Sequence, residues 1–520
     1  MFYKKENIML TKISLDKGSL IILLLLIGFI FRLVMTSNGN FIFNIDNARD
    51  YVDVREMVVA GKLRLTGPTS AIDGFYNGPF WYYLLAVPFV LADGNPYGGV
   101  VMMIVLWAIG GFFLLKLVSR WGSIAIITAG LVWAFSNYMT LASVYSFNPH
   151  PVTFLTPLFI YLLEKYLVEK KGRYLIGTFV LAGLFFNFEM NFGVFTPVII
   201  ILSLLIYRKF TFLKRAEFWV GIVVFLLFLT PQVLFDLKHE FIMSKSIIKY
   251  LSANDGGAYN LAARFKLISD NFINTFIPTY FNQKNFVQLS LLIFFLILIT
   301  QIRKKKIFDN KLVLISLIFI LIPYIGYIFI PVTVNSWHLG AVCTATIILL
   351  GFIIGELNNL KKFGTLTALS ILVAVGYFSY LNLIDFVSNF SKPNNDPSSF
   401  KNELVAIDYI YQSSGGKNFK VYTYLPSVID YPYQYLIWWR GTRKYGYLPE
   451  DYAYLPNKPK YIGSKEKFEN TKDIESSELV FLVKEPDRIK QRHLWENNFR
   501  DLTTVKKEMV GPIEIEIKSY

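Results

Sequence analysis

A series of long apolar runs, separated by short polar segments, limits this chain to a small set of folds. The runs are 19–35, 97–117, 123–141, 151–168, 174–189, 192–207, 217–235, 286–302, 311–331, 338–357 and 363–384. A helix that crosses a bilayer needs about 20 apolar residues. Only 17% of the residues are charged, whereas soluble domains have about 25%. The sequence therefore predicts an all-α polytopic membrane protein with about eleven transmembrane helices.

The basic residues indicate how these helices are oriented. A formal net charge of +15 would also suit a nucleic-acid-binding protein. The lysines and arginines, however, stand in short clusters at the ends of apolar runs, as the positive-inside rule describes for cytosolic loops. These clusters are Lys116/Arg120, Lys170/Lys171/Arg173, Arg208–Arg215, Arg303–Lys306 and Lys361/Lys362. They favour a cytosolic N-terminus, an external C-terminus and no nucleic-acid partner.

Two apolar runs need a separate decision. A signal peptide is the alternative for 19–35, but no small-x-small cleavage site follows it, so we interpret it as the first span. Residues 80–92 are short for a span, and runs of about 10–14 residues more often lie in the interface. A span there would also place Arg120 and the cluster 169–173 outside. Residues 80–92 are therefore predicted to lie along the outer surface, within an external loop 37–96.

Residues 385–520 differ in character from the rest of the chain. The segment 391–399 (SKPNNDPSS) is a typical linker. Beyond it, 401–412 has a helical pattern, and 419–424, 479–483 and 513–517 are predicted to be strands. The sequence thus predicts a transmembrane domain, 1–384, and a small external α/β domain, 385–520. The single cysteine, Cys343, lies in an apolar run and excludes a disulfide framework.

Tyrosine and tryptophan are dense in 422–454, including Trp438 and Trp439. These rings suit stacking on carbohydrate, contact with lipid headgroups or the aromatic core of a small domain. The pattern alone leaves these alternatives open.

The stretch 43–79 carries an unusual density of charge for so apolar a chain. Asp46, Arg49, Asp50 and Asp53 follow the i, i+3, i+4, i+7 spacing and share one face of a predicted helix. One interpretation is a helix along the membrane whose carboxylates face a water-filled cleft. The other is a solvated loop helix with i,i+4 ion pairs.

Three motifs resemble bacterial membrane glycosyltransferases of the GT-C class, in particular the protein O-mannosyltransferase and aminoarabinose transferase group. They are Asp46-x-x-Arg49-Asp50, Gly67-Pro68-Thr69-Ser70 and Gly78-Pro79-x-x-Tyr82-Tyr83-Leu84-Leu85-Ala86. The resemblance implies an acidic pair on a membrane-parallel helix in the first external loop. Asp46 takes the first acidic place, but Asn47 stands where many members have glutamate. Either Asp46 or Asp50 is therefore the predicted catalytic base.

Sugar transfer from a lipid phosphate has two chemical requirements. A base must take the proton of the acceptor hydroxyl, and cations must neutralise the departing phosphate. Asp46 or Asp50 suits the first requirement, and Arg49, Arg55 and Lys238 suit the second. Snorkelling at the membrane interface is an equally good explanation for Lys238.

Other polar residues of the predicted external loops complete a candidate cleft. Residues 235–239 resemble a Phe-Asp-Leu-basic-His stretch of the same family. His150 lies in loop 142–150, where several GT-C enzymes have a further acid that is missing here, so no metal is expected. Glu189 stands at a membrane edge, where a carboxylate needs water or a partner. The predicted cleft residues are His150, Glu189, Asp236, His239, Tyr82 and Tyr83. Arg32, at the end of the first span, is expected to pair with the Asp46 helix or to snorkel.

Two functions are compatible with these features. The first is an inverting glycosyltransferase that uses a polyprenyl-phosphate sugar, needs no cofactor and acts on a lipid, glycan or protein at the external face of a bacterial-type cell membrane. The second is a transporter or flippase of lipid-linked glycans. A transporter would place ionisable residues at mid-membrane, whereas this chain keeps its charges at the ends of spans. The enzyme is favoured, mainly by the resemblance.

Overall fold

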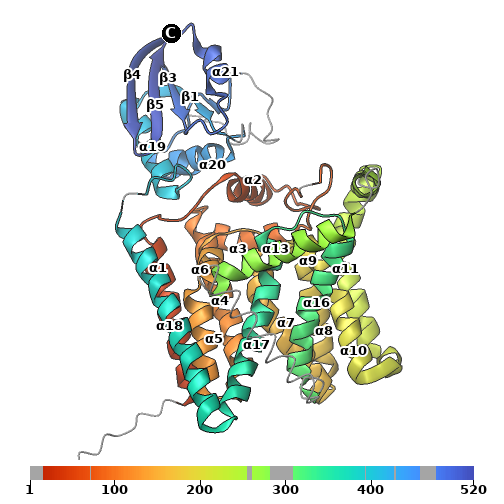
Figure 1. Cartoon of the computed structure of the whole chain (residues 1–520). Coiled ribbons are helices and arrows are strands. Elements are labelled where there is room, and N and C mark those ends of the chain that lie inside the picture. Colours follow the sequence, from red (N-terminus) through yellow and green to blue (C-terminus); the bar gives the residue numbers. More distant parts are fainter. Residues whose placement is uncertain are drawn as a thin grey trace, which may run out of the picture.

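The computed structural model shows a helical bundle with a small strand-containing domain at one end (Figure 1). It describes residues 16–70, 72–253, 260–280, 309–392, 394–426, 429–456 and 476–520. The predicted span 286–302 lies outside the described residues. We call the end of the bundle that contacts the C-terminal domain the domain end.

Most of the predicted spans are helices of the bundle. They are α1 Lys17–Thr36, α4 Tyr97–Val118, α5 Ser123–Phe135, α6 Asn137–Val144, α7 His150–Glu169, α8 Gly172–Phe188, α10 Thr196–Arg208, α11 Ala216–Lys238, α16 Lys311–Phe329, α17 Gly340–Asn358 and α18 Lys361–Ser391. Among the described residues, eight helices are long and apolar enough to cross a membrane, or nine if α5 and α6 form one span bent by 52°. The prediction of a polytopic membrane protein is confirmed.

The break between α5 and α6 explains the position of Arg32. Its side chain is buried, with Nε donating to Ser143 Oγ at 2.6 Å and Nη1 donating to the Ala134 carbonyl at 2.9 Å. The guanidinium also lies 3.8 Å from the ring centroid of Trp107. Because a helix end leaves carbonyl groups without intrahelical partners, Arg32 supplies the donors that the broken span needs. The expected pairing of Arg32 with the Asp46 helix is therefore wrong.

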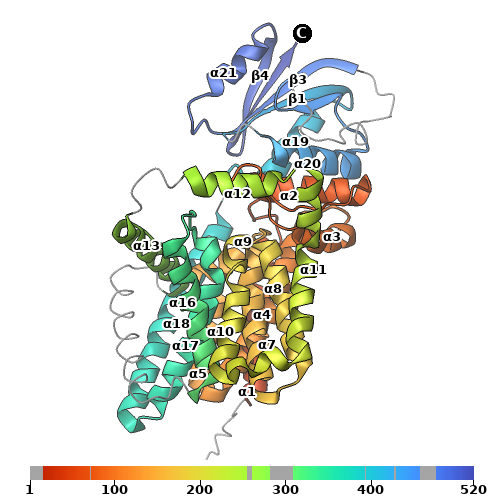
Figure 2. The same cartoon turned by 90° about the vertical axis from the view of Figure 1, so that its right-hand side faces the viewer.

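Further helices cover the domain end of the bundle (Figures 1 and 2). They are α2 Ile45–Val59, α3 Phe80–Leu91, α9 Met190–Gly193, α12 Ile242–Ala253, α13 Leu261–Tyr280 and η4 Ser336–Leu339. Helix α3 is shorter than a membrane span and packs against α2. Residues 80–92 therefore contribute to the surface on which α2 lies.

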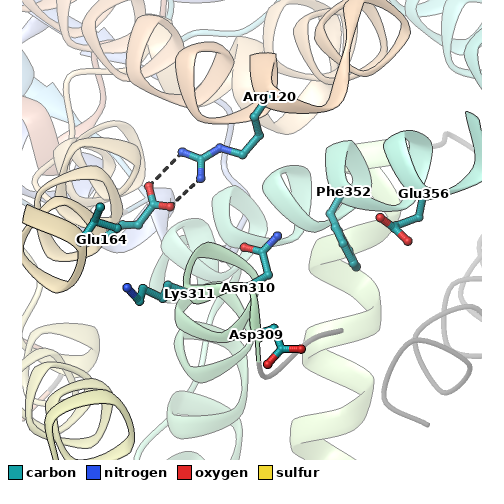
Figure 3. A pocket seen from close by; sticks show the side chains of 8 residues that line it. Arg120, Glu164, Asp309, Asn310, Lys311, Phe352 and Glu356 are labelled. Carbon is teal, nitrogen blue, oxygen red and sulfur yellow. Dashed lines mark hydrogen bonds and ion pairs between the residues drawn. The ribbon is translucent and has the colours of Figure 1, made fainter. Parts of the chain in front are cut away.

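The opposite end of the bundle gathers basic side chains. Lys17 Nζ donates to the Ser119 carbonyl at 2.9 Å, and Lys311 Nζ lies 3.3 Å from the Leu167 carbonyl. Arg120 forms a bidentate pair with Glu164, with N–O distances of 2.5 and 2.9 Å. This pair lines an open pocket together with Asp309, Asn310 and Glu356 (Figure 3). Such pairs hold the helix ends together on the side away from the C-terminal domain.

The C-terminal domain is a mixed sheet with helices. Its elements are α19 Phe400–Ser413, β1 Asn418–Tyr424, α20 Tyr431–Arg440, β2 Asp451–Ala453, β3 Ser476–Lys484, α21 Arg492–Glu496, β4 Thr503–Val510 and β5 Ile513–Ser519. The strand order is β2-β1-β3-β5-β4, in which β2, β1 and β3 are parallel and β5 is antiparallel to both β3 and β4. The predicted helix and the three predicted strands are confirmed. Strand β4 was missed because it is an exposed, charged edge strand without an apolar face.

Glu403 of α19 is buried without a neutralising partner. Neither of its carboxylate oxygens has a hydrogen-bond partner in the part of the chain that the structure describes. Burial, and then the charges of Glu485 and Asp396, raise the pKa of Glu403 well above its ordinary value. Burial also raises the pKa of Glu485 to about 7. A carboxyl group whose pKa is higher in the folded state stabilises the fold in acid, and this stability is lost as the pH rises.

Glu403→Gln is therefore expected to stabilise the C-terminal domain at pH 8 by at least about 1.4 kcal/mol, which is the free energy of one pKa unit, because the neutral amide does not have to take up a proton when the domain folds. At pH 4.5 the effect should be small, because Glu403 is then protonated in the folded state and about half protonated in the unfolded state. Thermal unfolding of the full chain at both pH values measures the difference. The exposed Glu478→Gln is the matched control. An equal shift of the melting temperature at both pH values would contradict this account.

Candidate active site

A tight hairpin between α2 and α3 shapes the candidate site. The Gly67 N–H donates to the Asn77 carbonyl at 2.9 Å, and the Asn77 N–H donates to the Pro68 carbonyl at 2.9 Å. A Cβ atom at Gly67 would collide with the Gly78 carbonyl, and one at Gly78 would collide with the side chain of Asn187. Glycine is therefore required at both positions for the hairpin to close. The hairpin returns the chain so that α3 packs beneath α2.

The first turn of α2 is fixed by a cap. Asn44 Oδ1 accepts hydrogen bonds from the Asp46 N–H at 3.1 Å and from the Tyr145 hydroxyl at 2.9 Å. A capping side chain satisfies a helix N–H that has no other partner. Asp46 thus stands in the first turn of α2, where the positive end of the helix dipole favours a carboxylate.

Asp50 is buried and held on both sides. Its Oδ1 accepts from Arg49 Nη2 at 3.0 Å and Nε at 3.1 Å, and its Oδ2 accepts from the Trp81 indole at 2.7 Å. Burial raises the pKa of Asp50 to about 6, although the charge of Arg49 and these hydrogen bonds oppose the shift. The Asp50 side chain is 0% exposed. Asp50 is therefore suited to orient Arg49 rather than to contact a substrate.

Asp46 is the accessible carboxylate of the pair. Its side chain is 43% exposed, and its Oδ1 lies 3.5 Å from Arg49 Nη1. Arg49 is 16% exposed and also donates from Nη1 to the Thr69 hydroxyl of the hairpin at 3.2 Å. The structure thus brings Asp46, Arg49 and Asp50 together and leaves Asp46 open to a reactant.

A second charged cluster continues this face of α2. Asp53 accepts from Arg64 at 2.5 Å and from the Tyr82 hydroxyl at 2.8 Å, while Arg64 also pairs with Glu56 at 2.8 Å. The Tyr83 hydroxyl donates to the Arg64 carbonyl at 2.9 Å. Tyr82 and Tyr83 therefore tie α3 to α2 beside the candidate site.

Four residues of this site were missed as site residues by the sequence reasoning. The spacing placed Asp53 on the helical face of Asp46, but Asp53 was given no role in the site. Trp81 precedes the predicted tyrosines directly. Thr69 and Arg64 lie in irregular loops, where no periodic pattern points to a partner.

Arg55 is not brought to Arg49. It is buried, and its guanidinium lies 5.0 Å from the ring centroid of Trp438 in the C-terminal domain. Burial lowers the pKa of Arg55. The neighbouring Tyr452 and Tyr435 hydroxyl groups act in the opposite direction and partly offset this decrease. Arg55 thus faces the C-terminal domain on a different side of α2.

His150 and Glu189 form buried contacts below α2. His150 Nδ1 lies 3.0 Å from the carbonyl of Tyr145, the residue that also contacts the α2 cap. Glu189 Oε1 accepts from the Asn191 N–H at 3.0 Å and lies 3.9 Å from His338 Nε2. His150 is therefore linked to the candidate site through Tyr145, whereas Glu189 belongs to a separate polar pair.

The predicted residues near the end of α11 lie beside the hairpin. Gln232 Nε2 donates to the Tyr76 carbonyl at 3.1 Å, which joins α11 to residues 67–78. Asp236 caps α12 by accepting from the Met243 N–H at 2.7 Å.

Lys238 and His239, at the C-terminal end of α11, are exposed. His239 Nδ1 lies 2.8 Å from the Phe235 carbonyl. Lys238 has no hydrogen bond or ion pair within the described residues. Those residues also contain no group of three or more His, Cys, Asp and Glu side chains that could hold a metal ion.

These features define a polytopic membrane protein of the GT-C-like fold, with a small domain packed on the first long loop. Two solved structures share this fold over almost the whole chain. One is ArnT from Cupriavidus metallidurans bound to undecaprenyl phosphate, with a TM-score of 0.60 and 12% identity over 96% of this chain and 97% of that chain. The other is ArnT from the same organism in the apo state, with a TM-score of 0.60 and 11% identity over 96% and 98% of the two chains.

The similarity extends to structure only. No protein-family model matches the sequence, and no curated protein matches it. At 11% and 12% identity the likeness shows a common fold. The resemblance to the aminoarabinose transferase group, first seen in three motifs, is thus confirmed at the level of the fold.

Proposed function

We propose that this chain is an inverting glycosyltransferase that moves a sugar from a polyprenyl-phosphate donor to an acceptor hydroxyl. The observation that carries the proposal is the exposed Asp46 carboxylate beside an arginine that a buried aspartate orients. The fold shared with an ArnT structure that binds undecaprenyl phosphate supports the choice of donor. The acceptor class, whether lipid, glycan or protein, stays open.

Each group of the site has one role in this reaction. Asp46 takes the proton of the acceptor hydroxyl as the oxygen attacks the anomeric carbon. The bond from that carbon to the phosphate oxygen breaks, and polyprenyl phosphate leaves with the electron pair. A single displacement of this kind inverts the anomeric configuration.

The cations act on the leaving group. Arg49 presents a planar fork that matches phosphate oxygens, and its orientation is fixed because Asp50 holds both Nε and Nη2. Lys238, exposed at the end of α11, is a candidate for a second contact with the phosphate. Because the charge on the phosphate grows as the sugar departs, cations fixed in advance stabilise the transition state.

The same proposal places the site on the external face of the membrane. The basic clusters gather at the end of the bundle opposite α2, and lysine and arginine are typical of cytosolic loops. The C-terminal domain, which contacts α2, would then be external as well.

One experiment separates this function from that of a transporter or flippase. The purified chain is reconstituted in sealed vesicles with a polyprenyl-phosphate donor that carries a labelled sugar, and envelope extract supplies acceptors. A transferase breaks the sugar–phosphate bond and forms labelled product on the face that carries the C-terminal domain. A flippase moves the intact donor between leaflets. Intact donor with changed leaflet distribution would overturn the proposal.

A further inference from the structure

Helix α2 depends on its neighbours for its position. It carries the candidate site but is only 15 residues long, and isolated helices of about this length are marginal in water. Irregular segments connect it to α1 and α3. The location of Asp46 and Arg49 is therefore set by whatever packs on the other faces of α2.

The C-terminal domain packs on one of those faces. Tyr51 and Arg55 stand four residues apart, so they lie on the same side of α2. The Tyr51 ring lies 5.2 Å from the ring of Tyr435, and the Arg55 guanidinium lies 5.0 Å from the ring of Trp438. All four side chains are buried. Helix α20 thus contacts α2 through two pairs on one face.

The domain is itself anchored on both sides of α2. Before α2, the Phe43 N–H donates to the Ser398 carbonyl at 2.8 Å, and the Phe400 N–H donates to the Phe41 carbonyl at 3.0 Å. After α3, the Trp439 indole donates to the Asp93 carbonyl at 3.1 Å. The first two bonds tie the start of α19, and the third ties α20, to the chain segments that flank α2 and α3. Figure 2 shows α20 directly above α2.

We propose that Arg55 and Trp438 are positioning residues, through which the C-terminal domain sets the place of α2 and hence of Asp46 and Arg49 in the reaction. The inference rests on the proposed function for its kinetic consequence, but its structural part is independent of it. A guanidinium over an aromatic face is held by the charge of the ring's π-electrons, and the attraction is larger when water is excluded. The C-terminal domain then contributes to the geometry of the active site, although it supplies no group that contacts the substrate.

The variants Arg55→Met and Trp438→Ala are expected to lower kcat about 10²-fold, since a misplacement of about 1 Å has an effect of that size. The KM for the donor should also rise, and by a similar factor in both variants, because Arg49, the proposed phosphate contact, moves together with α2. The conservative variants Arg55→Lys and Trp438→Phe keep the charge and the ring, and should restore most of kcat. Arg443→Met is the matched control, because it removes an exposed ion pair with Asp93 at the same seam without touching α2.

Hydrogen exchange of residues 45–59 in the full chain gives a readout that needs no activity. We expect protection in this segment to fall about tenfold in Arg55→Met and to remain unchanged in Arg443→Met. A donor KM that rises in Arg55→Met but not in Trp438→Ala would assign Arg55 to phosphate binding and overturn the proposal. Unchanged exchange in 45–59 would overturn it as well. If the wild-type chain transfers no sugar, the proposed function fails, and exchange alone decides whether α20 holds α2 in place.

Discussion

Replacing Asp46 with asparagine is expected to lower sugar transfer about 10²–10⁴-fold, the usual effect of losing a positioned general base. Asparagine has nearly the same shape, so the cap of α2 and the fold should be retained. Asp46 is singled out because it is the accessible carboxylate beside Arg49. Turnover of a labelled polyprenyl-phosphate donor, measured on protein with an unchanged melting temperature, tests this expectation.

Asp50→Asn is the matched control for Asp46→Asn. It keeps an acceptor for Trp81 but weakens the hold on Arg49, so a smaller loss is expected. Because the pKa of Asp50 is about 6, protonation below that pH should loosen Arg49 in the wild-type protein. Turnover should then fall as the pH drops through about 6, and this part of the pH profile should be absent in Asp50→Asn. Near-normal turnover in Asp46→Asn with an inactive Asp50→Asn would assign the base to Asp50.

The helical period explains which parts of the site could be predicted. Asp46, Arg49, Asp50 and Asp53 lie on one face because their spacing repeats every turn, and this needs only the sequence. Arg55 was grouped with Arg49 by charge alone. At about 100° per residue, six residues separate the two side chains by about 240°. The helix itself therefore turns Arg55 toward the C-terminal domain.

The contacts between elements could not be predicted in this way. Trp81 reaches Asp50 because the hairpin 67–78 folds α3 back beneath α2. That closure depends on the close approach of Gly67 to Gly78 and of Gly78 to Asn187 from a distant segment. Asp236 likewise caps α12 because of where Met243 lies after the turn. Local pattern gives the faces of helices, whereas tertiary packing decides which faces meet.

Arg49→Ala is expected to have two separable effects. It leaves the Asp50 carboxylate buried without its cation, and breaking a buried ion pair typically destabilises a fold by about 3–5 kcal/mol. It also removes the proposed phosphate fork, whose charged hydrogen bonds contribute about 1.5–3 kcal/mol each. Donor affinity should therefore fall at least about tenfold in the fraction that remains folded.

The double variant Arg49→Ala/Asp50→Asn separates these effects. In this variant no charge is left unpaired at position 50, so most of the lost stability should return. Donor affinity should stay low, because the Arg49 guanidinium is still missing. Lys238→Ala is the companion variant. Its side chain is exposed and has no ion-pair partner within the described residues, so a loss of donor affinity there would not be confused with unfolding. The melting temperature of each variant measures its stability, and titration with polyprenyl phosphate measures its donor affinity. If donor affinity recovers together with stability in the double variant, Arg49 serves only as the partner of Asp50, and the phosphate must be bound by other cations.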